Sequence, residues 1–441
     1  MALTKALVVW WDQTQVGVLD MDVHGDTEFV YAKRWLEAET SRPLSASLPL
    51  RAEPFKRREW RPFFAGLLPE QDQRKGAARA LGISEDNDYA LLDALGGDVA
   101  GALTLLPPGQ SPSNLQPSSE HKLLTEAETY DLLQEMAKRP LLAGTEGLRL
   151  SLAGAQSKLP VCIVSGKIAL PRTGEPSTHI LKPPILDFPA TTENEAFCLS
   201  LAKACDLSVA TARPAAAQGL TFLLVKRYDR SVNMTHLGTA GRNGEAYRVS
   251  CTRIHQEDFC QGLGVSPEKK YSADGGPGFK QCFELVGRMT AVPAKEAQKL
   301  LDAALFNLII GNCDAHGKNF SLLYTEQGAV LAPLYDLLST VVYPGLSHRL
   351  AMKIGGDAVL EEMTERTWER FAKDIGMTAP FVRRRAGEMA ALASDQAQPA
   401  ADALKLPFLD AAALDRHAEL VRTRAAKVMR IAVRPTPNAP R

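Results

Sequence analysis

The chain has 441 residues, and its 51 lysines and arginines balance 51 aspartates and glutamates, so the formal net charge is zero. This balance argues against a globally basic nucleic-acid-binding protein and against a strongly charged disordered chain. Hydrophobic residues make up 45% of the chain and charged residues 23%, as in ordinary globular proteins. We therefore expect two or three domains, each able to bury its own core.

The sequence indicates neither a membrane span nor an exported protein. No apolar run reaches the roughly 18 residues that a membrane helix needs, since the longest candidate, 301–310, contains Asp302 and Asn307. The first residues lack a signal-peptide cleavage pattern. The seven cysteines are scattered without a C-x-x-C pair, which argues against a zinc or disulfide framework. We expect a cytoplasmic protein.

Residues 1–105 are expected to form a small α/β domain. The alternating pattern of residues 7–21 predicts a hairpin. Residues 60–82 have a helical pattern that ends at Gly82. The segment 106–122 is rich in Pro and Ser and poor in apolar residues, so it is predicted to be an exposed linker.

The next part, 123–228, is predicted to be rich in strands. It opens with a capping box, Thr125 and Glu128, which starts a helix that continues to Lys138 and stops before Pro140. Short β-like runs follow at 159–165, 179–185 and 221–228, and one helix at 192–205 lies between the last two.

Helical patterns are predicted to dominate residues 229–433, which are followed by a tail at 434–441. The predicted helices cover 255–264, 278–289, 294–312, 364–376 and a last stretch that ends at 432. A small β-rich lobe followed by a large helical lobe is an α+β, two-lobed arrangement.

Two acidic motifs in the helical lobe suit phosphoryl transfer. The loop Asp314-Ala315-His316-Gly317-Lys318-Asn319 follows an apolar run. Its Asp can orient the hydroxyl that attacks a phosphate, and its Asn oxygen can bind Mg²⁺. Asp336, at the end of a second apolar run, suits a further ligand for a hard cation. We expect His316 to hold the loop by hydrogen bonds rather than to act as a general base.

Two further motifs precede these in the chain. Lys182, within an apolar strand, could place a positive charge on phosphate oxygens, and Glu195 on the following helix could pair with it. The small residues of the segment 151–158 would let backbone N–H groups approach a polyphosphate.

Each motif alone has a simpler explanation, such as a chance D-x-x-x-x-N, a turn aspartate, a surface lysine or an ordinary turn. Their order, which is the order in kinases, favours ATP-dependent phosphoryl transfer.

The same motifs make the chain resemble the HipA family, the serine/threonine-kinase toxins of bacterial toxin–antitoxin pairs. The resemblance rests on RPLSASLPL, FFAGLLPE and ALGGDVAGALTLLP in the first domain, and on LSLAGAQSKLP, THILKPP, KYSADGGPG, GNCDAHGKNFSLL and LYDLLST in the remainder. It implies a two-lobed kinase-like fold after a family-specific N-terminal domain, with ATP and Mg²⁺ as cofactors.

The resemblance also implies roles for individual residues. Asp314 would be the catalytic aspartate, Asn319 and Asp336 the Mg²⁺ ligands, and Ser151 the site of inactivating autophosphorylation. Gln256, Glu257 and Asp258 match another family motif, for which a structural network and a direct contact are equally open. The nucleotide-binding residues would be Ala153, Gly154, Ala155, Gln156, Ser157, Lys158, Lys182, Lys226, Arg227, Tyr228, His316, Gly317, Lys318, Asn319, Tyr335 and Asp336.

Finally, the resemblance implies partners: a HipB-like helix-turn-helix antitoxin, operator DNA that the complex represses, and a protein substrate such as an aminoacyl-tRNA synthetase, whose phosphorylation would stop translation and promote persistence. Two alternatives remain, a catalytically silent co-repressor and a kinase of small molecules or lipids.

Because Asp357, Glu361, Glu362 and Glu365 make one segment acidic, we expect DNA contact mainly through the antitoxin. The basic excess after Arg416 is expected to be a solvated helix face and a tail.

Overall fold

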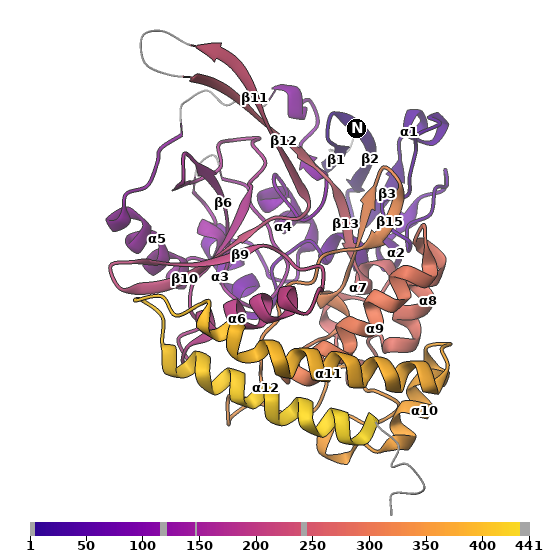
Figure 1. Ribbon diagram of the computed structural model, residues 1–441. Helices are drawn as coiled ribbons and strands as arrows, with labels where there is room; N and C mark the ends of the chain where they lie inside the picture. The colour runs from indigo at the N-terminus through magenta and orange to yellow at the C-terminus, as the bar shows by residue number, and fades with distance from the viewer. Residues whose placement is uncertain (1–4, 115–120, 146–147, 240–244, 433–441) are drawn as a thin grey trace, which may run out of the picture. The chain divides into compact units, whose positions relative to one another are not determined.

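The computed structural model describes residues 5–114, 121–145, 148–239 and 245–432 (Figure 1). The chain separates into two compact units. The first contains Met1–Pro183, Leu224–Glu257 and Leu323–Thr325, and the second contains Pro184–Leu223, Asp258–Leu322 and Glu326–Arg441. Within the described ranges, no helix has both the length and the hydropathy that crossing a membrane requires.

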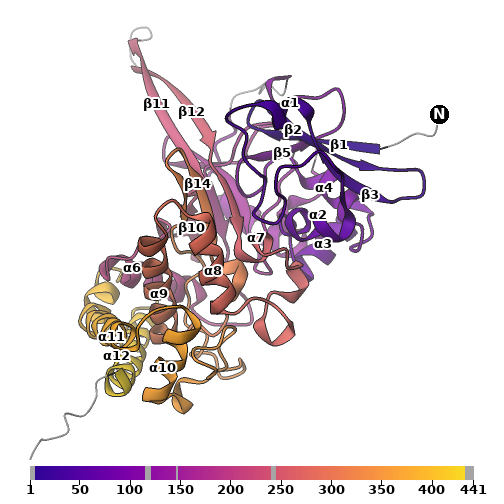
Figure 2. The same cartoon turned by 90° about the vertical axis from the view of Figure 1, so that its right-hand side faces the viewer.

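The N-terminal part of the first unit is built on an antiparallel five-stranded sheet (Figure 2). The predicted hairpin is confirmed, with Lys5 opposite Met21 and Trp11 opposite Thr14. Val9 and Leu19 are fully buried, as expected where one face of a sheet covers a core. In the order β4-β3-β2-β1-β5, the sheet contains β1 (Lys5–Trp11), β2 (Thr14–Met21), β3 (Thr27–Tyr31), β4 (Phe55–Lys56) and β5 (Leu103–Leu106).

Four helices accompany this sheet. The helical pattern predicted for 60–82 is two helices rather than one, because the chain passes through Pro69, which cannot donate a backbone hydrogen bond and disfavours helix at the residue before it. The predicted end is confirmed: Gly82 adopts φ +66° and caps the second helix. The helices are α1 (Lys33–Glu37), α2 (Arg57–Ala65), α3 (Gln71–Leu81) and α4 (Asp88–Leu95).

The predicted linker lies partly outside the described residues, which omit 115–120, and the predicted tail, 434–441, lies wholly outside them. Leu106, placed at the start of the predicted linker, ends β5 and is fully buried. A short 3-10 helix, η1, follows at Pro112–Asn114.

The β-rich part after the linker forms as predicted. Thr125 and Glu128 make the capping box of α5 (Glu126–Lys138), and η2 (Pro140–Leu142) follows. In the first unit the strands have the order β7-β6-β8-β10. Their bounds are β6 (Leu159–Val164), β7 (Lys167–Ala169), β8 (His179–Lys182) and β10 (Leu220–Lys226), which begins in the second unit beside β9 (Ala212–Ala217).

The prediction that helices dominate from residue 229 is wrong for the first thirty residues. This stretch forms β11 (Arg230–Thr239), β12 (Glu245–Arg253) and β13 (His255–Asp258). The predicted helix at 255–264 is reduced to α7 (Phe259–Gly262). Asp258 caps α7 by accepting a hydrogen bond from Gln261 N, so the helix begins only after Asp258.

The second unit is mainly helical, as predicted. Its helices are α6 (Thr191–Ala204), α8 (Phe279–Met289), α9 (Pro293–Ile310), α10 (Glu365–Asp374), α11 (Ala379–Asp402) and α12 (Ala411–Ala432). Its 3-10 helices are η4 (Pro267–Lys269), η5 (Ser272–Asp274), η6 (Gly317–Asn319) and η7 (Leu360–Glu362). Of the last strands, β15 (Gly328–Leu331) and the start of β14 (Ser321–Thr325) belong to this unit.

Helices α11 and α12 pack side by side (Figures 1 and 2). α11 has no counterpart among the predicted helices. Its buried stripe includes Ala386, Ala390, Ala393 and Ala397, and alanines give little hydrophobic contrast in a sequence. In three dimensions the same small side chains allow close packing. All these elements together make an α+β fold, as predicted.

Candidate active site

The candidate catalytic loop follows α9 in the second unit. Residues 300–310 at the end of α9 are buried, which fixes the position at which the helix ends. Gly311 caps α9 with φ +75°, a conformation that favours glycine. Asn312 then donates to Asn307 Oδ1 at 2.8 Å and accepts from Asp314 N at 3.2 Å. The loop is therefore held to a rigid helix end.

Asp314, the predicted catalytic aspartate, has a direct side-chain partner. The Tyr271 hydroxyl donates to Asp314 Oδ1 at 2.9 Å. The Tyr271 ring also meets the His316 ring edge to face, with centroids 5.2 Å apart. His316 N donates to Asp314 O at 2.7 Å, which closes a tight turn. Tyr271 therefore orients the carboxylate and supports the loop.

The two predicted Mg²⁺ ligands lie together. Asn319 Nδ2 donates to Asp336 Oδ2 at 3.2 Å. Asn319 Oδ1 is buried and, among the described residues, has no hydrogen-bond partner. A buried amide oxygen without a partner, next to a carboxylate, fits a hard cation that takes oxygen ligands. Asp336 adopts φ +56°, an uncommon conformation for a non-glycine residue, and such strain often accompanies function.

The remaining residues of the loop are fixed by neighbours in the second unit. The Tyr335 hydroxyl donates to Lys318 O at 2.7 Å and lies 2.7 Å from Ser321 Oγ. Lys318 Nζ forms a buried ion pair with Asp258 Oδ2 at 2.6 Å. A Cβ atom on Gly317 would lie 2.4 Å from the ring of Pro277, so only glycine fits there.

The motif Gln256-Glu257-Asp258 is a structural network. The carboxylate of Glu257 accepts hydrogen bonds from the Ser45 hydroxyl, from Ala46 N at 3.0 Å and from the Tyr324 hydroxyl. Gln256 accepts from the Tyr228 hydroxyl, and Asp258 pairs with Lys318 as described. Of the two interpretations that the sequence left open, these contacts favour the structural one.

In the first unit, the predicted nucleotide loop is docked on the N-terminal domain. Ser151 N donates to Asp98 O at 3.0 Å, and the Ser151 hydroxyl donates to Leu67 O at 2.7 Å. Glu70 N donates to Gly154 O at 3.2 Å. Ser151, the predicted phosphorylation site, is therefore fully buried in this conformation.

The same loop closes on itself at its far end. Lys158 Nζ donates to Ala153 O at 2.9 Å, and Gly154 adopts φ +112°. Because a Cβ atom at Gly154 would lie 2.5 Å from Lys158 Nζ, the small residue permits this turn. Ala155, Gln156 and Ser157 lie between the two ends.

The predicted strand lysine lies where it was expected. Lys182 is the last residue of β8 and is buried. Glu195, its predicted partner, is buried on α6. Lys182 belongs to the first unit and Glu195 to the second, so their pairing stays a prediction.

The predicted adenine hinge contains an unexpected buried ion cluster. Arg227 donates to Asp98 Oδ2 at 3.2 Å and to Asp229 Oδ2 at 2.8 Å. Arg230 pairs with Asp98 Oδ1 at 2.9 Å, and Ser177 Oγ donates to Asp98 Oδ2 at 2.6 Å. The Arg227 side chain therefore binds other residues of the protein. The backbone N–H of Arg227 donates to Thr178 O at 3.0 Å, so the backbone carbonyl of Arg227 is the group that could bind a ligand. Lys226 beside it is exposed.

The cluster shifts the acidity of its carboxyl groups. Burial by itself would raise the pKa of Asp98, but Arg230 and Arg227 outweigh it and hold that pKa below the usual range. The same balance of burial against Arg227 and Arg230 lowers the pKa of Asp229 to about 2. Both carboxylates therefore stay ionised, and they bind the N-terminal domain to the hinge strand.

The charged segments discussed for DNA contact have partners within the second unit. Asp357 pairs with Arg370 at 2.7 Å. On α12, Arg424 donates to Leu308 O at 2.8 Å at the end of α9, and Lys427 lies 3.8 Å from Glu361. The basic excess of the C-terminal helix is therefore at least partly structural.

Sequence reasoning missed two groups at the site. Tyr271 lies in the quoted motif KYSADGGPG, which was a signal for the family but not for a contact with Asp314. For the partnership between Asp98 and Arg227 no local signal exists, because it joins residues far apart in the chain.

Comparisons with known proteins identify the family to which the chain belongs. A family model described as the HipA N-terminal domain matches residues 7–106, and one described as the HipA-like C-terminal domain matches residues 150–397. The chain is 52% identical over 431 residues to "Putative kinase Y4mE" of Sinorhizobium fredii, which covers 97% of this chain and 99% of that protein. It is 32% identical over 367 residues to the serine/threonine-protein kinase toxin HipA of Shewanella oneidensis. This match covers 80% of this chain and 79% of that protein.

A solved structure is similar as well. It is the complex of HipA, HipB and operator DNA from Shewanella oneidensis MR-1. One chain of that structure matches this chain with a TM-score of 0.78 and 27% sequence identity, and the match covers 97% of this chain and 96% of the matched chain. The likeness confirms the predicted α+β, kinase-like fold.

Proposed function

Because this chain belongs to the HipA family of kinase toxins, we propose that it transfers the γ-phosphate of ATP to serine or threonine hydroxyls of a protein. The observation that carries the proposal is the arrangement after α9: Asn319 donates to the Asp336 carboxylate at 3.2 Å, and Asn312, two residues before Asp314, donates to the Asp336 backbone carbonyl at 3.4 Å. Phosphoryl transfer needs one carboxylate for the attacking hydroxyl and oxygen ligands for a cation, and this group supplies both.

In this proposal, Asp314 accepts or orients the proton of the attacking hydroxyl, while Tyr271 holds its Oδ1. Asn319 Oδ1 and the Asp336 carboxylate would hold Mg²⁺, which would neutralise charge on the phosphates. Tyr335 fixes the loop by its bond to Lys318 O. Hydrogen bonds within the protein hold the side chains of Asp314 and Asn319, so little reorganisation would be needed.

The first unit supplies a part of the proposed nucleotide contacts. Lys182 would place its positive charge on phosphate oxygens, and the loop 153–158 would offer backbone N–H groups. The backbone of 226–228 would bind the adenine, in line with the burial of the Arg227 side chain.

Autophosphorylation of Ser151 would inactivate the enzyme. The buried Ser151 hydroxyl bonds to Leu67 O, so this loop must leave the N-terminal domain before Ser151 can be modified. A phosphate adds about −1.5 to −2 charge. The phosphorylated side chain could not return to the buried position, which has room only for the serine hydroxyl. Such charge would also repel ATP phosphates.

The proposed partner is a HipB-like antitoxin. The support is the likeness to the HipA of Shewanella oneidensis, whose solved structure contains HipB and operator DNA. The zero net charge of this chain and the internal pairing of Arg424 and Lys427 support DNA contact mainly through the antitoxin. A protein substrate such as an aminoacyl-tRNA synthetase, and with it an arrest of translation that leads to persistence, is proposed from the family resemblance.

The proposal is tested with purified wild type, Asp314→Ala and the control Asp395→Ala, whose position is exposed on α11. Each is incubated with γ-labelled ATP, Mg²⁺ and a bacterial lysate. Wild type and the control should label themselves and a discrete protein, whereas Asp314→Ala should not. Equal labelling by Asp314→Ala would refute the proposal.

The same experiment separates the two alternatives. A labelled small molecule or lipid in place of a protein band would indicate a different kinase class. Complete absence of transfer by wild type, with retained antitoxin binding, would indicate a silent co-repressor. Growth arrest on induction of wild type, but not of Asp314→Ala, would support the toxin interpretation.

A further inference from the structure

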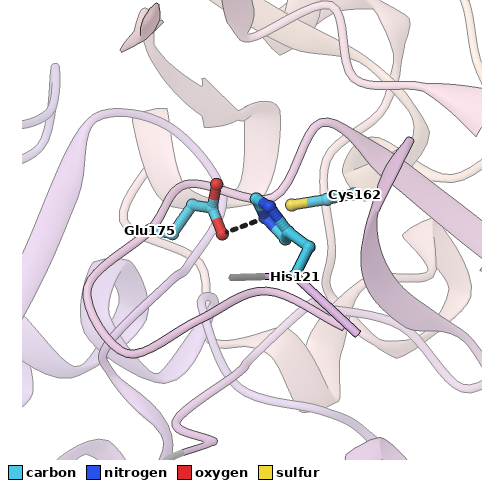
Figure 3. Close-up of side chains that lie close together, drawn as sticks. All are labelled: His121, Cys162 and Glu175. Atoms are coloured by element: carbon cyan, nitrogen blue, oxygen red, sulfur yellow. Dashed lines mark hydrogen bonds and ion pairs between the residues drawn. The ribbon is translucent and has the colours of Figure 1, made fainter. Parts of the chain in front are cut away.

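Three side chains of the types that bind metal ions lie close together in the first unit (Figure 3). His121 lies near the end of the segment 106–122, Cys162 lies on β6, and Glu175 lies in the loop before β8. One ligand atom from each lies within 4.8 Å of the others. Cys162 is buried, and His121 and Glu175 are half-buried, with side chains 15% and 18% exposed.

We propose that His121, Cys162 and Glu175 form a binding site for a zinc-like divalent cation. Nitrogen, sulfur and carboxylate oxygen are the ligands that zinc takes, and three protein ligands leave a fourth position open. A magnesium site would not use a thiolate. This site is therefore chemically distinct from the pair Asn319 and Asp336.

The three ligand atoms lie within 4.8 Å of one another, so small movements of the side chains would bring them to the spacing of a bound site. With Zn–N, Zn–O and Zn–S bonds of about 2.0–2.3 Å, tetrahedral ligand atoms lie about 3.3–3.7 Å apart. His121 Nε2 and Glu175 Oε2 lie 2.7 Å apart in a hydrogen bond. These two atoms must therefore part by less than about 1 Å for a cation to enter, which half-buried side chains can do without moving the backbone.

Binding a cation requires a defined change of protons. The thiol proton of Cys162 passes to solvent, and His121 must carry its remaining proton on Nδ1 so that Nε2 can bind. The negative charges of the thiolate and of Glu175 then balance the two positive charges of the cation. No redox step is involved.

Arg172 is the internal competitor for this site. Its backbone N and side-chain Nε donate to Glu175 Oε2 at 3.1 and 3.2 Å, and its Nη2 donates to Oε1 at 3.3 Å. These bonds hold Glu175 in place, and the positive charge of Arg172 offsets the negative charge of its carboxylate. We therefore expect a neutral residue at position 172 to strengthen cation binding, an effect that a purely structural hydrogen-bond cluster would not show.

The sequence could not reveal this site, because its ligands lack the short C-x-x-C spacing that marks zinc frameworks. A bound cation would join the end of the segment 106–122 to β6 and to the loop that leads into β8, the strand that carries Lys182. Its occupancy would thus stabilise the sheet of the β-rich part.

The experiment titrates metal-free full-length protein with Co²⁺, whose bond to a thiolate gives a charge-transfer absorption. Wild type should bind one equivalent with this absorption, Zn²⁺ should displace the Co²⁺, and excess Mg²⁺ should not. Cys162→Ser should lose the absorption, while Cys205→Ser, the matched control, should keep it. His121→Gln and Glu175→Gln should weaken binding at least as much as the loss of an outer-shell partner, about 10- to 100-fold, and His348→Gln should not.

Arg172→Gln should bind Co²⁺ more tightly than wild type, and saturating Zn²⁺ should raise the melting temperature of wild type but not of Cys162→Ser. The proposal is overturned if wild type shows no thiolate absorption, or if Cys162→Ser keeps it. Because residue 162 is buried, Cys162→Ser could fail to fold, which circular dichroism would detect. In that case the test is made with His121→Gln, whose position is partly exposed. An unchanged affinity of this variant for Co²⁺ also overturns the proposal.

Discussion

Removal of the Tyr271 hydroxyl is the sharpest test of how the loop orients its aspartate. Tyr271→Phe deletes the bond of 2.9 Å to Asp314 Oδ1. It keeps the aromatic ring that packs edge to face on His316. The substitution therefore changes the position of one carboxylate while leaving the packing of the loop in place.

The magnitude follows from the kind of bond that is lost. A hydrogen bond to a charged group contributes about 1.5–3 kcal/mol. At about 1.36 kcal/mol for each tenfold change in rate, loss of orientation should lower kcat about 10- to 150-fold. KM for ATP should change little, because Tyr271 is a positioning residue for Asp314 and is not among the residues proposed to bind the nucleotide.

The assay measures steady-state phosphate transfer over a range of Mg-ATP concentrations, so that kcat and KM are determined separately. Tyr130→Phe on α5, in the other unit, serves as the matched control and should retain the wild-type rate. An unchanged kcat for Tyr271→Phe, or a loss confined to KM, would refute the proposed positioning role. A melting temperature close to that of wild type confirms that the variant is folded.

Three other predictions concern stability and packing. Asp98→Asn should lower the free energy of unfolding by about 3–5 kcal/mol, because buried arginines lose their counter-ion. The control Asp72→Asn, whose side chain is 92% exposed, should change this free energy by less than about 0.5 kcal/mol. Urea unfolding measures both values. Since the folded pKa values of Asp98 and of Asp229, the latter about 2, lie below the unfolded values, their contribution is complete above about pH 5 and falls as the pH is lowered towards 2. The urea midpoint should therefore drop over that range, and it should drop less in Asp98→Asn. Gly317→Ala should destabilise the protein by about 1–3 kcal/mol through its clash with Pro277 and reduce phosphate transfer; wild-type melting and activity would contradict the close approach.

The sequence by itself determined most of the local elements, and it singled out the candidate catalytic loop. The capping box at Thr125 and the glycine at position 82 are local signals, and both have the predicted effect. The spacing of Asp314 and Asn319 depends on a single loop, so it can be recognised without knowledge of the fold. Where the pattern was weak or mixed, as in the alanine stripe of α11 and in the residues before Phe259, the predictions failed.

Only the tertiary structure decided which side chains share a site. Tyr271 reaches Asp314, Arg227 reaches Asp98, and His121 reaches Glu175, although each pair is separated by tens of residues in the chain. A polar side chain that leaves water must find its partner in three dimensions, and the identity of that partner depends on how distant elements pack. Periodicity and spacing describe one element at a time, so they specify the chemistry of a loop but not the contacts that orient it.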